Sequence, residues 1–226
     1  MEKIPIAKII EFRRKKSEST RATLINNLKK NKEKESSSKG GHYWTTSVSA
    51  ISAFYKTNNF ELIIEKIDDL LVRQRSTNHK GSKIMYQKNI EILYNFEDFD
   101  FTEFKPKLPL TYISKPIDKS IIEVNGIPIQ VRPQHVYKYK ENNIEKIGAI
   151  WFVAKKDGFE SPEIGIFSEA LYKYLYIHYS ENFEINTEFC IAQDVTNLIE
   201  IKYTQIKNNE IPSLLNLSLE SIKKFI

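Results

Sequence analysis

The sequence predicts an α+β fold in which a helical N-terminal part precedes a mixed β-sheet with a crossover helix. Apolar residues in the first 98 positions recur at helical spacing, whereas those after residue 120 form alternating or unbroken short runs. Between the two, residues 99–119 form a proline-punctuated connector, and proline disfavours helix at itself and at the residue before it. With 226 residues, of which 41% are apolar, the chain is long enough to bury a sizeable core.

The part spanning residues 1–98 is predicted to be helical. Its clearest helix is capped by Asn58 or Asn59, because the apolar residues that follow fall at i, i+3, i+4, i+7, i+10 and i+11 (Phe60, Ile63, Ile64, Ile67, Leu70 and Leu71). Further helices are predicted over residues 4–16, after Ser19, from Trp44 onward and around Ile92. Residues 34–41 are polar and end in two glycines, which predicts a loop.

The part spanning residues 120–226 is predicted to run strand-strand-strand-helix-strand-strand. Asn125-Gly126 favours a tight turn between the first two strands. The unbroken apolar run of residues 147–154 is typical of a central strand that is buried on both faces, with Trp151 and Phe152 on opposite sides. The predicted segments are strands over residues 121–124, 127–139, 147–154, 188–195 and 198–203, and a helix over residues 161–179.

Composition favours a cytoplasmic protein. The single cysteine, Cys190, allows no internal disulfide, as is usual in a reducing compartment, and its apolar strand context predicts an inert buried thiol. The N-terminal residues lack the apolar core of a secretory signal, and no run reaches the roughly 18–20 apolar residues that a membrane span needs.

Positive charge is concentrated in the N-terminal part. Residues 1–90 contain 19 lysine and arginine residues against 9 acids, whereas residues 91–226 contain 15 against 20. A basic field of this kind attracts polyanions, most often nucleic acid, but the same pattern is also found on the solvated face of a lysine-rich helix. The candidate phosphate-binding residues are Arg13, Arg14, Lys15, Lys16, Lys29, Lys30 and Lys32.

Two lysines, Lys155 and Lys156, follow the central strand directly. The strand order before and after them, over about residues 120–205, resembles the core of the PD-(D/E)xK restriction-endonuclease-like nucleases. The resemblance implies an acid on the second strand and an acid-x-lysine motif on the third, with carboxylates that hold Mg²⁺ to activate water. Only Lys155 matches the motif, because Gln134 and Val153 occupy the two acidic positions.

Three functions follow from these observations. The first is a protein with a degenerate endonuclease-like domain that binds nucleic acid through its basic N-terminal part without cleaving it, and the resemblance suggests defence against foreign DNA. The second is a magnesium-dependent nuclease in which Lys155 contacts phosphate or water and migrated carboxylates, Glu163 and Asp194, hold the metal. The third is a protein-interaction or assembly subunit that binds no nucleic acid and no cofactor.

Trp44 is a further candidate, because a tryptophan at a predicted helix start either anchors the preceding basic loop or presents an aromatic face to a ligand. The tyrosines of residues 161–179 are explained by packing against a sheet or by stacking on bases. For Lys155 and Lys156, the alternative to a site is that long side chains end a buried strand and carry their charges to water.

Overall fold

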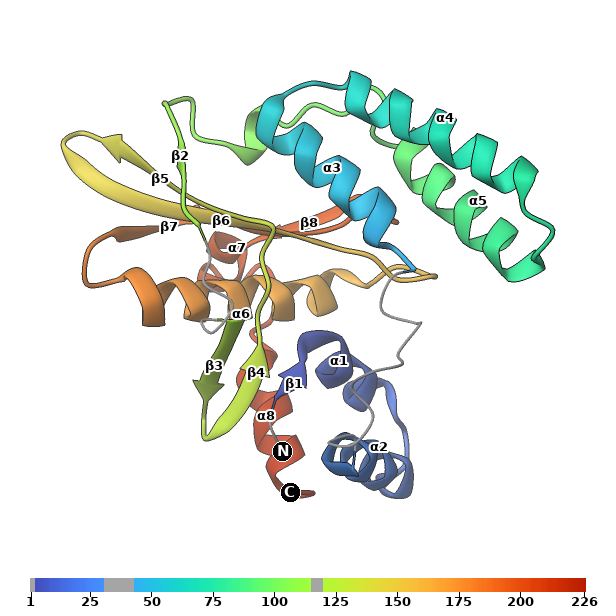
Figure 1. The fold of residues 1–226 in the computed structure, drawn as a ribbon. Helices are drawn as coiled ribbons and strands as arrows, with labels where there is room; N and C mark the ends of the chain where they lie inside the picture. Colours follow the sequence, from blue (N-terminus) through green and yellow to red (C-terminus); the bar gives the residue numbers. More distant parts are fainter. Residues whose placement is uncertain (1–2, 31–42, 115–119) are drawn as a thin grey trace.

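The computed structural model describes residues 3–30, 43–114 and 120–226. It confirms the α+β class: N-terminal helices precede a mixed five-stranded sheet (Figure 1). The loop predicted at residues 34–41 lies outside the described residues. The five N-terminal helices are α1 (Ile6–Arg14), α2 (Glu18–Lys30), α3 (Thr45–Thr57), α4 (Glu61–Ser76) and α5 (Lys80–Tyr94).

The main sheet has the strand order β2-β5-β6-β7-β8. Its central strand, β6, pairs antiparallel with β5 and parallel with β7, and β7 pairs antiparallel with β8. The crossover from β6 to β7 is made by α6 (Ser161–Tyr179), as predicted. The strands are β2 (Thr111–Tyr112), β5 (His135–Glu141), β6 (Ile144–Val153), β7 (Glu184–Asp194) and β8 (Ile199–Lys202).

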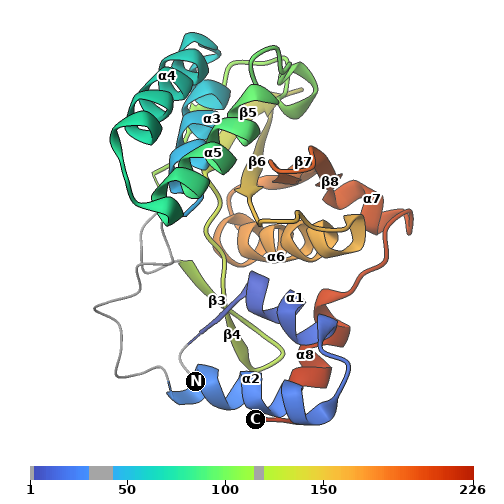
Figure 2. The same ribbon diagram turned by 90° about the vertical axis from the view of Figure 1, so that its right-hand side faces the viewer.

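Each face of the main sheet is covered by helices, and each side has its own hydrophobic core (Figure 2). Trp151 points to the core beneath α6, where its ring lies 5.1 Å from that of Phe167. Phe152 points to the opposite core, which α3, α4 and α5 cover. Their exposed fractions are 8% and 2%, so the prediction that both are buried on opposite faces of a central strand is confirmed.

A second sheet holds three short strands in the order β1-β4-β3: β1 (Ile4–Pro5), β4 (Ile127–Gln130) and β3 (Ile121–Val124). The hairpin predicted at Asn125-Gly126 is present, and Asn125 and Gly126 have φ of 52° and 75°. The hairpin does not join the main sheet. The strand β1 pairs in parallel with β4, so Ile4 and Pro5 contact the C-terminal part of the chain.

The prediction of one strand over residues 127–139 is wrong. Residues 131–134 are not in a strand, and the segments before and after them, β4 and β5, belong to different sheets. The register of β5 and β6 would place Pro133 opposite Phe152, and proline has no N–H for the ladder. The side chain of Gln134 instead makes two hydrogen bonds to the backbone of Phe152. Its Nε2 donates to the Phe152 carbonyl at 3.2 Å, and its Oε1 accepts from the Phe152 N–H at 2.7 Å.

Two helices follow the last strand, α7 (Tyr203–Lys207) and α8 (Leu215–Lys223). In both views α8 lies beside α1 and α2 (Figures 1 and 2). Buried residues of α1 and α8 belong to the core beneath α6, so the basic N-terminal helices and the C-terminal part share one core. Among the described residues no helix has the length and apolarity needed to cross a membrane.

Candidate functional site

Lys155 begins the turn that follows β6. Its carbonyl accepts from the Gly158 N–H at 3.1 Å, and Gly158 has φ of 66°, in the left-handed region. The Lys155 ammonium stands 5.5 Å from the centre of the Phe159 ring, over the core beneath α6. Lys155 is half-buried and Lys156 is exposed, so both side chains carry their charge to the surface at the end of a buried strand.

Asp194 ends β7 and is fully buried. Its Oδ2 accepts from the Phe159 N–H at 2.8 Å, and its Oδ1 accepts from the Thr196 N–H at 3.0 Å. Burial raises the pKa of the Asp194 carboxyl, and these hydrogen bonds oppose that shift. The carboxylate therefore joins the loop after β7 to the turn after β6.

Glu163 lies in the first turn of α6 and is also buried. Both of its oxygens accept hydrogen bonds from the Arg14 guanidinium, and Oε2 also accepts from the Glu160 N–H at 3.0 Å, which completes a capping box. The Glu163 carboxylate raises the pKa of the Arg14 guanidinium, mainly through its hydrogen bonds with that guanidinium. Glu163 thus fixes α1 to the start of α6.

Lys155, Glu163 and Asp194 each have different partners in the structure. The partners of Asp194 are backbone N–H groups, whereas Glu163 faces α1. Within residues 3–30, 43–114 and 120–226, no group of three or more histidine, cysteine, aspartate and glutamate side chains is placed to hold a metal ion. Of the two positions where the nuclease pattern has acids, Gln134 is bonded to the strand backbone and Val153 is buried.

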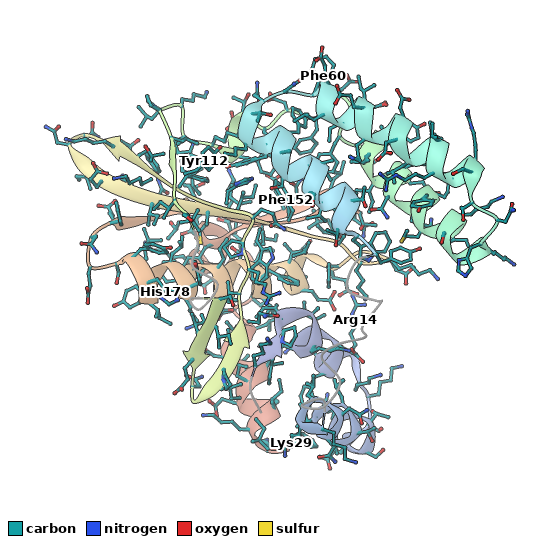
Figure 3. All side chains as sticks on the ribbon, viewed as in Figure 1. Arg14, Lys29, Phe60, Tyr112, Phe152 and His178 are labelled. Carbon is teal, nitrogen blue, oxygen red and sulfur yellow. The ribbon has the colours of Figure 1, made fainter. Side chains whose placement is uncertain are left out.

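The predicted phosphate-binding residues lie on α1, on α2 and in the turn between them. Several have protein partners: Arg14 is paired with Glu163, the Lys15 ammonium lies 3.8 Å from Glu11, and Lys29 donates to the carbonyls of Phe225 and Ile226. Figure 3 shows Arg14 and Lys29 at the end of α1 and on α2. The prediction for Lys32 concerns a position outside the described residues.

Three of the predicted residues, Arg13, Lys16 and Lys30, are exposed and have no carboxylate partner in the described part of the chain. Arg13 donates to the Ser218 hydroxyl of α8 at 3.2 Å, which leaves its charge uncompensated. We call the exposed face of α1, α2 and α8 the basic surface. Its basic members are Arg13, Lys15, Lys16, Lys29, Lys30, Lys223 and Lys224, and the acids Glu11, Glu18 and Glu220 lie on the same helices.

Lys223 and Lys224 were not among the predicted residues, although α8 had a readable signal. Its buried residues Leu215, Leu219 and Ile222 are spaced as in an amphipathic helix. The N-terminus of α8 is held by Glu169, whose Oε2 accepts from the backbone N–H groups of Leu214 and Leu215. No sequence pattern indicates that this helix lies beside α1.

Comparisons with protein-family models, with curated proteins and with solved structures found no match to this chain. The function of the protein is therefore inferred from its fold and from the contacts of its own residues.

Proposed function

We propose that this protein binds nucleic acid through the basic surface and does not cleave it. The observation that carries the proposal is a set of positive charges on that surface: Arg13, Lys16 and Lys30 are exposed and have no carboxylate partner among the described residues. Lys224, at the end of α8, adds a fourth exposed charge. Phosphates are the general partner of such clusters.

The dimensions of the surface suit a nucleic-acid backbone. Lys16 lies two residues before α2 and Lys30 is its last residue, and the 13 residues of α2 at 1.5 Å per residue span roughly 20 Å. This length matches about six base pairs of duplex at 3.4 Å each. The contacts are made by charged tips without fixed geometry, so binding independent of sequence is expected.

The contacts of the acidic residues support binding over cleavage. Glu163 and Asp194 already accept hydrogen bonds at both carboxylate oxygens, and these bonds fix α1 and two loops. A metal would compete with those structural partners. The resemblance to restriction-endonuclease-like nucleases would place the protein in defence against foreign DNA, and Cys190, buried and unpaired, fits a cytoplasmic location.

The test is a titration of a labelled duplex of random sequence, about 20 base pairs long, followed by fluorescence anisotropy at several salt concentrations. Each phosphate contact adds about −0.9 to the slope of log affinity against log salt. The triple variant Arg13→Gln, Lys16→Gln, Lys30→Gln should make the slope less steep by roughly two to three and weaken binding at low salt.

The matched control changes three exposed lysines elsewhere, Lys83→Gln, Lys107→Gln and Lys140→Gln, which alters net charge by the same amount. The control should bind like the wild type. Equal weakening by both triple variants would show that only overall charge matters, and no binding at low salt would end the proposal in favour of a protein-interaction subunit.

The nuclease alternative is tested with the same duplex and with single-stranded RNA in the presence of Mg²⁺ or Mn²⁺. We expect intact substrate. Cleavage that is lost in Lys155→Ala and in Glu163→Gln or Asp194→Asn would restore the metal-dependent nuclease.

A further inference from the structure

A pocket of about 270 Å³ opens where α3, α5 and the loops after β6 and β7 meet. It is lined by Trp44, Lys88, Glu91, Asn95, Lys156 and Thr196, together with one apolar residue of α5. None of these residues belongs to the basic surface. Trp44 and Lys156, about 110 positions apart in the sequence, come together here.

The pocket lies beyond the carboxyl ends of β6 and β7, the parallel pair of the main sheet. Val153 and Asp194 form the last rung of that pair, and Lys156 and Thr196 follow them within three residues. Open sheets with parallel strands bind ligands in the crevice outside these ends, where the loops diverge. The remaining lining residues come from Trp44 at the start of α3 and from the last part of α5.

One wall of the pocket is fixed by Asn89, which is almost fully buried. Its Nδ2 donates to the carbonyls of Tyr43 and Met85, both at 2.8 Å, and its Oδ1 accepts from the Ser47 N–H at 3.1 Å. The amide thereby ties the start of α3 to α5. The half-buried Trp44 is held at this junction, with its ring 4.4 Å from that of Tyr43.

The other wall is fixed by Asp194. Its bonds to the Phe159 and Thr196 N–H groups, together with the bond from the Thr196 hydroxyl to the Lys155 carbonyl at 3.0 Å, join the two loops. Lys156 extends from this braced turn and is exposed, with no carboxylate partner in the described ranges. Two buried polar side chains thus hold both walls in place before any ligand arrives.

The charges of the pocket suit a single phosphate. Lys156 supplies one positive charge that has no salt-bridge partner among the described residues, and Lys88 supplies a second that is paired with Glu91 at 2.6 Å. Both partners of that pair are more than a third exposed, so the pair is weak and Lys88 can turn toward an anion at little cost. Glu91 disfavours a longer polyphosphate chain.

We propose that this pocket binds a nucleoside monophosphate unit. The base stacks on the indole of Trp44, as bases do on aromatic side chains, and the phosphate sits between Lys156 and Lys88. The Asn95 amide can donate and accept hydrogen bonds to the sugar or the base edge, and the Thr196 hydroxyl, whose hydrogen is donated to the Lys155 carbonyl, can accept one. A free nucleotide and the terminal nucleotide of a strand present the same chemistry to these residues.

Tryptophan fluorescence reads this binding directly. The chain has two tryptophans, and Trp151 is buried in the core beneath α6, so quenching by an added base reports Trp44. Adenosine and uridine monophosphates should quench saturably, whereas the nucleosides bind more weakly and inorganic phosphate does not quench. Trp44→Ala should weaken binding about 5- to 100-fold, measured by calorimetry.

Lys156→Gln should weaken binding of the monophosphates about tenfold and leave binding of the nucleosides unchanged. Lys155→Gln is the matched control, because it removes the same charge from the same turn while its ammonium stands over Phe159, and it should bind like the wild type. Equal effects of the two lysine variants, or no saturable quenching up to roughly 10 mM monophosphate, would overturn the proposal.

A 5′-phosphorylated oligonucleotide distinguishes the two sources of the ligand. If it binds more tightly than the monophosphate, the ligand is the end of a strand, and equal affinity identifies the free nucleotide. The triple variant of the basic surface should retain monophosphate binding, and Lys156→Gln should retain the salt slope on duplex DNA. The pocket and the basic surface are therefore tested independently.

Discussion

At the scale of single residues, the buried polar groups of this protein serve to join elements. Asp194 connects two loops, Asn89 connects two helices and Glu169 holds the N-terminus of α8. Each accepts or donates at least two hydrogen bonds, which offsets the cost of removing a polar group from water. Removing any one of them leaves buried backbone N–H or carbonyl groups without a partner.

Asp194 makes stability depend on pH. Burial raises its pKa above the value of about 3.9 in an unfolded chain, so the native state keeps a proton at pH values where the unfolded state has lost it. Its contribution to the free energy of unfolding therefore falls as pH rises from the unfolded pKa through the native pKa. Urea denaturation between about pH 4 and pH 7 should show this fall in the wild type relative to Asp194→Asn.

Asp194→Asn should also lower the free energy of unfolding at every pH by about 1–3 kcal/mol, because the amide nitrogen cannot accept from a backbone N–H. A difference between the two proteins that stays constant with pH would show that the native carboxyl titrates like that of an unfolded chain.

Trp151 tests the packing of the central strand. Its ring is buried between β6 and α6 against Phe167, so Trp151→Ala should lower the free energy of unfolding by about 3–5 kcal/mol. Denaturant titration followed by circular dichroism measures the change. Trp44→Ala, at a half-buried position, should cost much less, and equal losses would contradict the burial of Trp151.

At the scale of elements, the pairing of β6 with β7 depends on Gly148. The register between these strands shifts between Ile147 and Ala149, and a Cβ at Gly148 would lie 2.8 Å from the Phe189 carbonyl oxygen and 2.9 Å from the Tyr137 ring. Contacts this short force the backbone or a buried ring to move. Gly148 is therefore required by the close approach of three strands.

Gly148→Ala should destabilise the protein by about 1–3 kcal/mol through overpacking, measured as a lower midpoint in urea. The control is Gly126→Asn at the hairpin turn, where an added Cβ would meet no atom within 4 Å beyond its chain neighbours and asparagine tolerates the positive φ. That variant should stay close to the wild type, and the reverse order of stabilities would exclude the proposed strand contacts.

The elements differ in how far the sequence predicts them. The central strand β6 can be predicted from the sequence, because an unbroken apolar run of this length is typical of a strand that is buried on both faces. The interruption at Pro133 cannot be predicted in this way, because it depends on which strands β4 and β5 pair with in the folded protein. The same holds for the site: the exposure of Lys16 and Lys156 is a local property, but the pairing of Arg14 with Glu163 spans 149 positions and follows only from the assembled fold.

At the scale of the whole molecule, the basic helices and the sheet are interlocked. The strand β1 and the helix α1 contribute Ile4, Ile6 and Ile9 to the core beneath α6, and α3, α4 and α5 cover the other face of the sheet. A fragment of residues 120–226 would keep α6 on one face, but it would expose the face that α3, α4 and α5 cover and the part of the other core that β1 and α1 contact.

We therefore expect that fragment to aggregate or to unfold without a cooperative transition when it is heated, whereas the full chain melts cooperatively. Circular dichroism and analytical size exclusion measure both. A cooperative melt of the monomeric fragment would mean that the sheet part is a domain in its own right.

The side chain of Gln134 bonds the backbone of Phe152, opposite Pro133, which has no N–H to donate. This arrangement limits which substitutions the central strand tolerates. A carboxylate at position 134 would have no hydrogen to donate to the Phe152 carbonyl, and a carboxylate at position 153 would enter the buried core beneath α6. Both substitutions toward the nuclease pattern thus weaken the central strand before any metal could bind. For selection or for a protein engineer, both substitutions that lead from this sequence toward a metal-dependent nuclease are therefore unfavourable while Pro133 is present.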